Sequence, residues 1–141
     1  YGCNMTYDTT YMYHATTCYT ILLNERNNEK SLAFLGLFNS RLLWYFLSET
    51  GNVLRGGYFR FKTKYLEPFP IPEIPDDVAD LLSKKVQTVL DAKSVDITAE
   101  TKTIENEINL LVYHLYGLTY DEVLIVDPET PITREEYEKN M

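Results

Sequence analysis

The residues best suited to chemistry with a partner are basic and lie in the first half of the chain. Residues 54–65 contain four cations and no acid, and another arginine precedes them. Lysine and arginine neutralise phosphates and release counterions, and arginine can donate two hydrogen bonds to a guanine edge. A tyrosine among them can stack on a base or bond to phosphate. The candidate nucleic-acid contacts are Arg41, Arg55, Tyr58, Arg60, Lys62 and Lys64.

The side chains of this group differ in what they can recognise. The forked donors of Arg55 and Arg60 suit base edges, whereas Lys62 and Lys64 suit phosphates. The plainer alternative is an ordinary exposed strand whose outer face carries cations.

A nuclease pattern is present only formally. Asp76, followed by Glu100 and Lys102, matches two carboxylates and a lysine around a catalytic metal. That chemistry needs the groups to converge from neighbouring strands, but these residues begin two separate amphipathic segments. Phosphate-cradling glycine loops and the serine elbow of hydrolases are absent from the sequence. We therefore expect no catalytic residue in this chain.

Soft metal ligands are also few. Cys3, Cys18, His14 and His114 form no C-x-x-C or similar zinc spacing. We expect buried thiols in a reducing cytoplasm and a hydrogen-bonded structural role for His114, which lies between apolar neighbours. No metal and no cofactor is expected within these residues.

The charge is unevenly divided along the 141 residues. The net charge is −8, but residues 1–64 carry +3 and residues 65–141 carry −11. This asymmetry indicates a basic working surface joined to an acidic support that repels phosphate. No apolar run reaches the roughly 20 residues of a membrane-spanning helix. Because the sequence begins without Met or a leader, we expect a fragment of a longer, cytoplasmic protein.

The elements expected to position the cations are mostly strands. Residues 55–65, if extended, place Tyr58, Arg60, Lys62 and Lys64 on one face. One nearly all-apolar helix is expected over residues 31–48, buried and ended near Gly51. The other predicted strands, rich in tyrosine, threonine and isoleucine, are residues 5–7, 11–13 and 18–23. The expected core side chains of this half are Leu35, Phe38, Leu42, Trp44, Phe59 and Phe61.

The second half reads as helical. Apolar residues at helical spacing predict helices over 76–93 and 98–116, and their short link favours an antiparallel hairpin. Two capping boxes, Thr119 with Glu122 and Thr133 with Glu136, each predict the start of a short helix. The fold class is therefore α+β: an N-terminal mixed β-sheet with a buried helix, then a C-terminal helical hairpin with short extra helices. The predicted division is 1–67 for recognition, 68–75 as a proline-rich connector and 76–141 as helical support.

Several pieces of the sequence, in order, resemble one known family. They are Phe38-Asn39-Ser40-Arg41-Leu42, Arg55-Gly56-Gly57-Tyr58, Arg60-Phe61-Lys62, Tyr65-Leu66 and Pro70-Ile71-Pro72, and the tail from Leu111 to Thr119 with Glu122. The chain is similar to the TaqI-like C-terminal specificity domain. Such domains lie at the C-terminal end of adenine-specific DNA methyltransferases and of fused type II restriction–modification enzymes.

This resemblance implies a target-recognition domain that holds double-stranded DNA. In the family, a separate catalytic domain of the same polypeptide binds S-adenosylmethionine, flips an adenine and methylates its N6. Its N-P-P-Y-type motif is absent from these 141 residues, so no catalytic or cofactor residue is transferred.

Two other functions remain open from the sequence. Specificity subunits of type I restriction systems have a similar order of recognition domain, proline-rich exit and long helix. A protein-interaction module without a DNA role would instead act through the C-terminal hairpin and its Ile104, Ile108 and Leu111 stripe.

Overall fold

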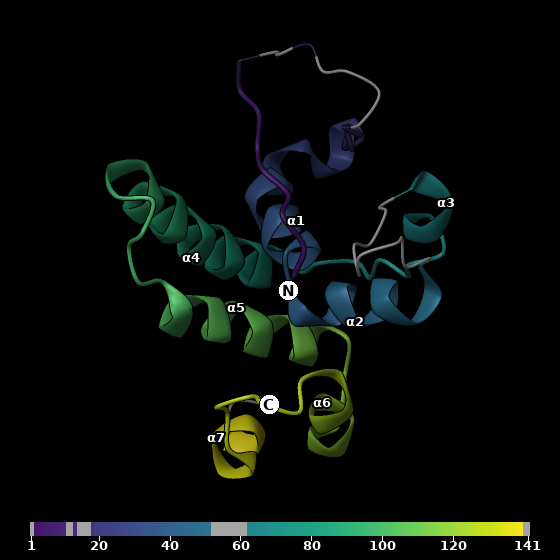
Figure 1. The fold of residues 1–141 in the computed structure, drawn as a ribbon, viewed down its shortest axis with the longest axis vertical. Helices are drawn as coiled ribbons and strands as arrows, with labels where there is room; N and C mark the ends of the chain where they lie inside the picture. Colours follow the sequence, from purple (N-terminus) through teal and green to yellow (C-terminus); the bar gives the residue numbers. More distant parts are fainter. Residues whose placement is uncertain (1, 11–12, 14–17, 52–61, 140–141) are drawn as a thin grey trace.

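The structure is a computed structural model that describes residues 2–10, 13, 18–51 and 62–139, and those residues fold into helices joined by irregular segments (Figure 1). The helices are η1 (Glu25–Lys30, a 3₁₀-helix), α1 (Ser31–Phe38), α2 (Arg41–Thr50), α3 (Thr63–Leu66), α4 (Asp76–Val95), α5 (Lys102–Leu115), α6 (Tyr120–Val126) and α7 (Arg134–Lys139). No helix among these residues is long and apolar enough to cross a membrane.

The predicted α+β fold class is wrong, because the described ranges contain no β-strand and therefore no sheet. Residues 5–7 and 18–23 have no regular secondary structure, and residues 63–66 are the helix α3 instead of the end of an extended ribbon. The other parts of the predicted strands, residues 11–12 and 55–61, lie outside the described residues. Tyrosine, threonine and isoleucine favour a strand only where a partner strand supplies cross-strand contacts.

The single helix predicted over residues 31–48 is two helices, because Ser40 starts a new one. Ser40 has extended backbone angles, and its Oγ accepts a hydrogen bond from the Leu43 N–H at 3.3 Å. Serine is a favoured N-cap because this bond satisfies an amide that the first turn leaves unpaired. α2 then ends at Gly51, as predicted, where the Gly51 N–H donates to the Leu47 carbonyl.

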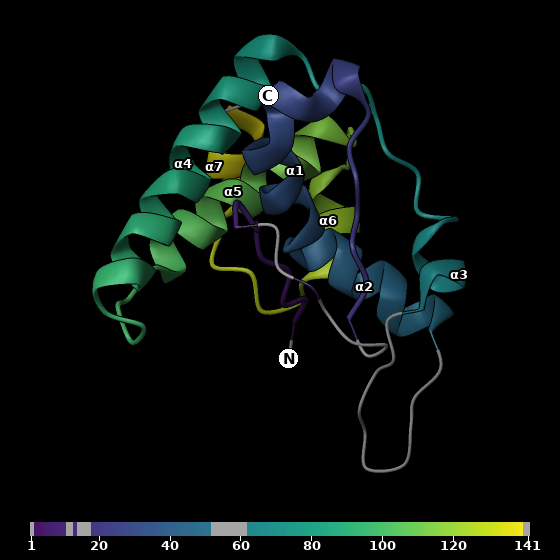
Figure 2. The same cartoon turned by 90° about the horizontal axis from the view of Figure 1, so that it is seen from above.

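The core forms where α1 lies against α4 and α5 (Figures 1 and 2). Gly36 lets α1 come close, since a Cβ there would stand 2.9 Å from Val86 Cγ2. α4 and α5 form the predicted antiparallel hairpin. Because α1 packs on this hairpin, residues 1–67 and residues 76–141 of the predicted division contribute to one core. Of the predicted core residues, Leu35, Phe38 and Leu42 are buried and Trp44 is half-buried, whereas Phe59 and Phe61 lie outside the described residues.

The proline-rich stretch is bound to the helices through its apolar residues. Phe69 and Ile74 are buried, and the Tyr116 hydroxyl donates to the Pro70 carbonyl at 2.8 Å. Ile71 is exposed. The stretch is therefore held against α5 on its way to α4.

α6 and α7 begin where the sequence predicts, and α5 ends just before Gly117 as expected. α5 begins at Lys102 instead of residue 98, and α4 runs two residues past its predicted end. Thr119 and Glu122 form a reciprocal capping box at α6, and Thr133 and Glu136 form the same pair of bonds at α7. Gly117 ends α5 with a φ of 64°, a left-handed conformation that glycine adopts without strain. These caps fix where the acidic helices start relative to α5.

Candidate nucleic-acid interface

Arg41 is the first residue of α2, and its backbone is fixed to α5. Its N–H donates to Asn109 Oδ1 at 2.9 Å, and Asn109 is itself buried. The Arg41 side chain is exposed. Asn109 and Ser40 accept hydrogen bonds from two backbone amides in the first turn of α2. These bonds hold the backbone at Arg41 in a fixed position.

Lys62 and Lys64 lie at α3, which packs beside the far end of α2 (Figures 1 and 2). Lys62 precedes the helix without a side-chain cap bond, and Lys64 is exposed with its Nζ 4.6 Å from the centre of the Tyr65 ring. Neither lysine forms an ion pair with another described residue. At 1.5 Å per residue, α2 separates Arg41 from this end by about 14 Å.

The geometry therefore revises the predicted ribbon. Because residues 63–66 are helical, Lys62 and Lys64 do not lie on one face of an extended strand as predicted. Arg55, Tyr58 and Arg60 lie outside the described residues, so their assignment stays a prediction. The structure places Lys62 and Lys64 at α3, beside one end of α2, and Arg41 at the other end of α2.

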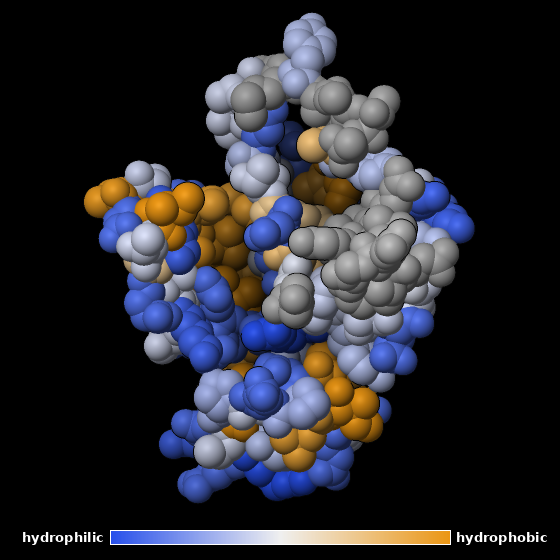
Figure 3. All heavy atoms as spheres, in the orientation of Figure 1, coloured by the Kyte–Doolittle hydropathy of each residue, from blue (hydrophilic) through white to orange (hydrophobic). Residues whose placement is uncertain are grey.

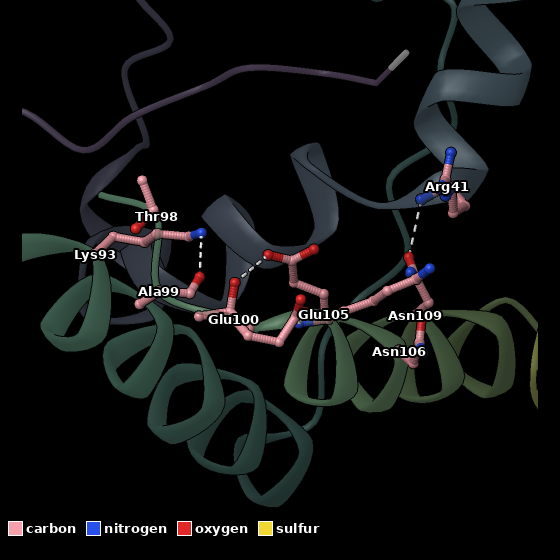
Figure 4. A pocket seen from close by; sticks show the side chains of 10 residues that line it. Arg41, Lys93, Thr98, Ala99, Glu100, Glu105, Asn106 and Asn109 are labelled. Atoms are coloured by element: carbon pink, nitrogen blue, oxygen red, sulfur yellow. Dashed lines mark hydrogen bonds between the residues drawn. The ribbon is translucent and has the colours of Figure 1, made fainter. Parts of the chain in front are cut away.

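A polar pocket of about 300 Å³ lies along the first half of α5, between Arg41 on one side and the α4–α5 link on the other (Figure 4). Lys93 donates to the Ala99 carbonyl at 2.6 Å, and Glu105 accepts from Thr101 Oγ1 at 2.6 Å. Lys102 and Glu100 also line it. These two bonds join the link, residues 96–101, to the end of α4 and the start of α5, so they stabilise this end of the hairpin.

A second hollow of about 450 Å³ lies between α4 and the N-terminal residues. On the face shown in Figure 3, apolar atoms gather here beside α4. The Asn39 amide crosses its edge, donating to the Met5 carbonyl at 3.0 Å and accepting from the Met5 N–H at 2.8 Å. The apolar lining residues are Cys3, Met5, Leu35, Trp44, Val86, Val89, Leu90 and Ile108.

The acidic half pairs some of its charges and exposes the rest. Lys30 lies 2.6 Å from Asp76, and this hydrogen bond lowers the pKa of the Asp76 carboxyl. Arg134 lies 2.5 Å from Asp121 and also pairs with Glu138. The remaining carboxylates on α4 to α7 give these helices a surplus of negative charge, which disfavours a polyanion at this part of the surface.

The formal nuclease pattern does not converge. Asp76 begins α4 and Glu100 follows its end, about 28 Å away at 1.5 Å per residue. Glu100 accepts from the Lys102 N–H at 2.9 Å, so it caps the start of α5. No group of three histidine, cysteine or carboxylate side chains is placed to hold a metal within the described ranges.

The cysteines and His114 differ from their predicted settings. Cys3 is half-buried, and burial raises the pKa of its thiol to about 11, whereas Cys18 is exposed. His114 packs edge-on against the Tyr137 ring at 4.3 Å between ring centres. Its buried Nε2 has no hydrogen-bond partner among the described residues, so the predicted hydrogen-bonded role is not seen at this atom.

Sequence reasoning missed the two asparagines that fix this region. Asn39 holds residue 5, and Asn109 holds the first turn of α2. The signal for Asn39 was its place with Ser40 inside an apolar run, because a polar pair there marks a helix junction. Asn109 lies on a helix whose other inward residues are apolar, which indicates a buried amide with a specific partner.

Comparison with known proteins identifies a DNA-specificity module. The family described as the TaqI-like C-terminal specificity domain matches residues 2–71. These residues belong to that family, which connects them with DNA recognition in restriction–modification enzymes. No curated protein and no solved structure matches the chain.

Proposed function

We propose that this chain recognises a short sequence in duplex DNA for a catalytic domain of the same polypeptide that methylates adenine at N6. The observation that carries this proposal is the specificity-domain match over residues 2–71, which contains all six candidate contacts. The cofactor S-adenosylmethionine belongs to that catalytic domain, and the protein works in the cytoplasm. Cleavage of the DNA would require a further nuclease domain.

The placement of the described cations supports this proposal. Arg41 and the Lys62–Lys64 pair stand at opposite ends of α2, which is held by buried residues on one side. Rigid elements present charges to a phosphate backbone at fixed separation, and the acidic helices orient the duplex by repulsion. Arg41 and the lysines position the DNA, while base reading is assigned to Arg55 and Arg60.

The test measures how tightly the whole chain binds a labelled duplex of random sequence, with fluorescence anisotropy as the readout. The double variant Lys62→Glu/Lys64→Glu should weaken binding at least tenfold, because two phosphate contacts are replaced by repulsions. The matched control is Lys84→Glu/Lys139→Glu, an equal charge reversal at exposed sites on α4 and α7. It should change the affinity much less.

The salt dependence separates specific charge contacts from general repulsion. Replacing Lys62 and Lys64 by glutamine should reduce the slope of log K against log salt by about 1.8, from roughly 0.9 per phosphate. An unchanged slope, or an equal loss of affinity in the Lys84→Glu/Lys139→Glu control, would overturn the assignment of these lysines to phosphate.

A further inference from the structure

The polar pocket along α5 and the apolar hollow beside α4 adjoin and form one cleft. Arg41, Lys93, Glu105 and Asn109 line both spaces, so these four residues stand at their junction. The two volumes, about 300 and 450 Å³, are within the range of small-molecule sites, roughly 300–1,000 Å³. The cleft therefore has room for a ligand with one polar end and one apolar end.

Asn109 brings a hydrogen-bond donor to this junction. The residue is only 9% exposed, and its Oδ1 accepts from the Arg41 N–H at 2.9 Å (Figure 4). Its Nδ2 donates to no other residue in the described part of the chain. Buried polar groups are nearly always hydrogen-bonded, so an amide nitrogen at a cleft without a protein acceptor indicates an acceptor oxygen on a ligand.

The other polar groups of the cleft also favour an oxygen-bearing anion. Lys93 uses one of its three ammonium donors on a backbone carbonyl, and it forms no ion pair with a described carboxylate. The cations Arg41, Lys93 and Lys102 line the polar pocket together with the carboxylates of Glu100 and Glu105. Three cations against two carboxylates leave an excess of one positive charge. Charge-assisted hydrogen bonds from such donors to an anion are stronger than neutral ones.

The other end of the cleft suits an apolar body. Val89 and Leu90 of α4, Trp44 of α2 and Met5 of the N-terminal residues are among the side chains that line the hollow, and all four are half-buried. Figure 3 shows apolar atoms gathered beside α4 on this face. An apolar ligand in the hollow would remove both its own surface and this lining from water.

We propose that this cleft binds a small carboxylic acid with an unbranched apolar chain. The two carboxylate oxygens accept from Asn109 Nδ2 and from the Lys93 ammonium group, and the chain lies in the hollow. A DNA phosphate fits less well, because it brings no apolar group for the hollow. A cationic amphiphile would meet the excess positive charge of the polar pocket. The site is separate from Lys62 and Lys64, which lie at the other end of α2.

The experiment titrates the whole 141-residue chain with decanoate below the concentration at which it forms micelles. The readout is the fluorescence of Trp44, the single tryptophan of the sequence, which lines the hollow. We expect a saturable change with one ligand bound per chain. Decanol has the same chain but no charge, so it should bind at least about tenfold more weakly. Acetate has the carboxylate without the chain and should leave the fluorescence unchanged.

A pair of variants tests the polar end separately from the apolar end. Lys93→Gln should weaken decanoate binding at least about tenfold and leave decanol binding unchanged, because only the charged head depends on the ammonium group. The matched control is Lys84→Gln, the same change of charge at an exposed site on α4. It should leave the affinity for decanoate unchanged.

Nuclear magnetic resonance of the isotope-labelled chain tests the contact at Asn109 directly. Decanoate should shift the side-chain amide signals of Asn109, because its Nδ2 gains an acceptor. The side-chain amide signals of Asn28, an exposed residue of η1, should stay in place.

The absence of a saturable response to decanoate overturns the proposal, as does equal affinity for decanoate and decanol. Equal losses in Lys93→Gln and Lys84→Gln also overturn it. So does a loss of helical circular dichroism in step with the fluorescence change, since decanoate would then be unfolding the chain. Lys62→Glu/Lys64→Glu should bind decanoate normally, so failure of DNA binding and failure of ligand binding are recorded independently.

Discussion

At the scale of single residues, Asn39 links two parts of the chain that are far apart in sequence. Its side-chain amide bonds both backbone groups of Met5, and its Nδ2 also donates to the Leu35 carbonyl at 3.0 Å. An amide has both a donor and an acceptor, so it can satisfy one residue of an extended segment as a strand partner would. Asn39 therefore satisfies the backbone N–H and carbonyl of Met5, as a neighbouring strand would in a sheet.

Replacing Asn39 by alanine should release this segment. We expect Asn39→Ala to lower the free energy of unfolding by about 1–2 kcal/mol, since each lost hydrogen bond contributes about 0.5–1.5 kcal/mol and the site is exposed. Hydrogen exchange should show faster exchange of the Met5 amide. Asn28→Ala, at an exposed residue of η1, is the control, and equal Met5 exchange in both variants would contradict the role of Asn39.

At the scale of elements, the contact of α1 with α4 and α5 depends on Gly36. A Cβ at this position would lie 2.9 Å from Val86 Cγ2 and 3.4 Å from Ile108 Cγ2. Both of these neighbours are buried, so they have little room to move. Glycine lowers the helix propensity of α1 at this position, but its lack of a side chain allows α1 to pack close to α4 and α5.

The variant Gly36→Ala should therefore destabilise the protein. Alanine improves helix propensity by about 1 kcal/mol, but overpacking a tight core costs about 1–3 kcal/mol. We expect a net loss of about 1 kcal/mol in chemical denaturation. Gly2→Ala is the matched control, because a Cβ there meets nothing within 4 Å. If Gly36→Ala stabilised the chain, the tight contact between α1 and Val86 would be refuted.

The elements predicted correctly are those specified locally. The capping boxes at Thr119 and Thr133 and the glycine at position 117 involve residues three or four apart, so the sequence contains all their partners. The strand prediction for residues 18–23 failed because a strand requires a partner that local propensity does not encode. The sequence identifies Lys62 and Lys64 as candidate contacts by their charge. It does not predict their arrangement at the helix α3, because local propensity favoured an extended strand there.

At the scale of the whole molecule, hydrogen bonds to carboxylates make the stability of the fold depend on pH. Four carboxyls have a pKa below the ordinary value, each because it accepts hydrogen bonds: Asp76 from Lys30, Asp96 from Thr98, Glu122 from Thr119 and Glu136 from Thr133. A carboxylate that is more acidic in the folded state than in the unfolded state stabilises the fold above its unfolded pKa. Asp76, Glu122 and Glu136 lie in the first turns of α4, α6 and α7, so the starts of these helices depend on ionised carboxylates.

This linkage predicts the response of the whole chain to acid. The free energy of unfolding should be nearly constant from neutral pH to about pH 5, where carboxyls are ionised in both states. It should fall as the pH drops below 4.5, the ordinary value for Glu122, because the unfolded state then binds protons first. Glu122→Gln keeps an acceptor for the Thr119 N–H but cannot titrate, so its stability should fall less steeply with acid in urea titrations between pH 3 and 7. Glu129→Gln, at an exposed site between α6 and α7, should keep the steeper wild-type slope, and identical slopes in the two variants would show that the Thr119 bonds do not lower the pKa of Glu122.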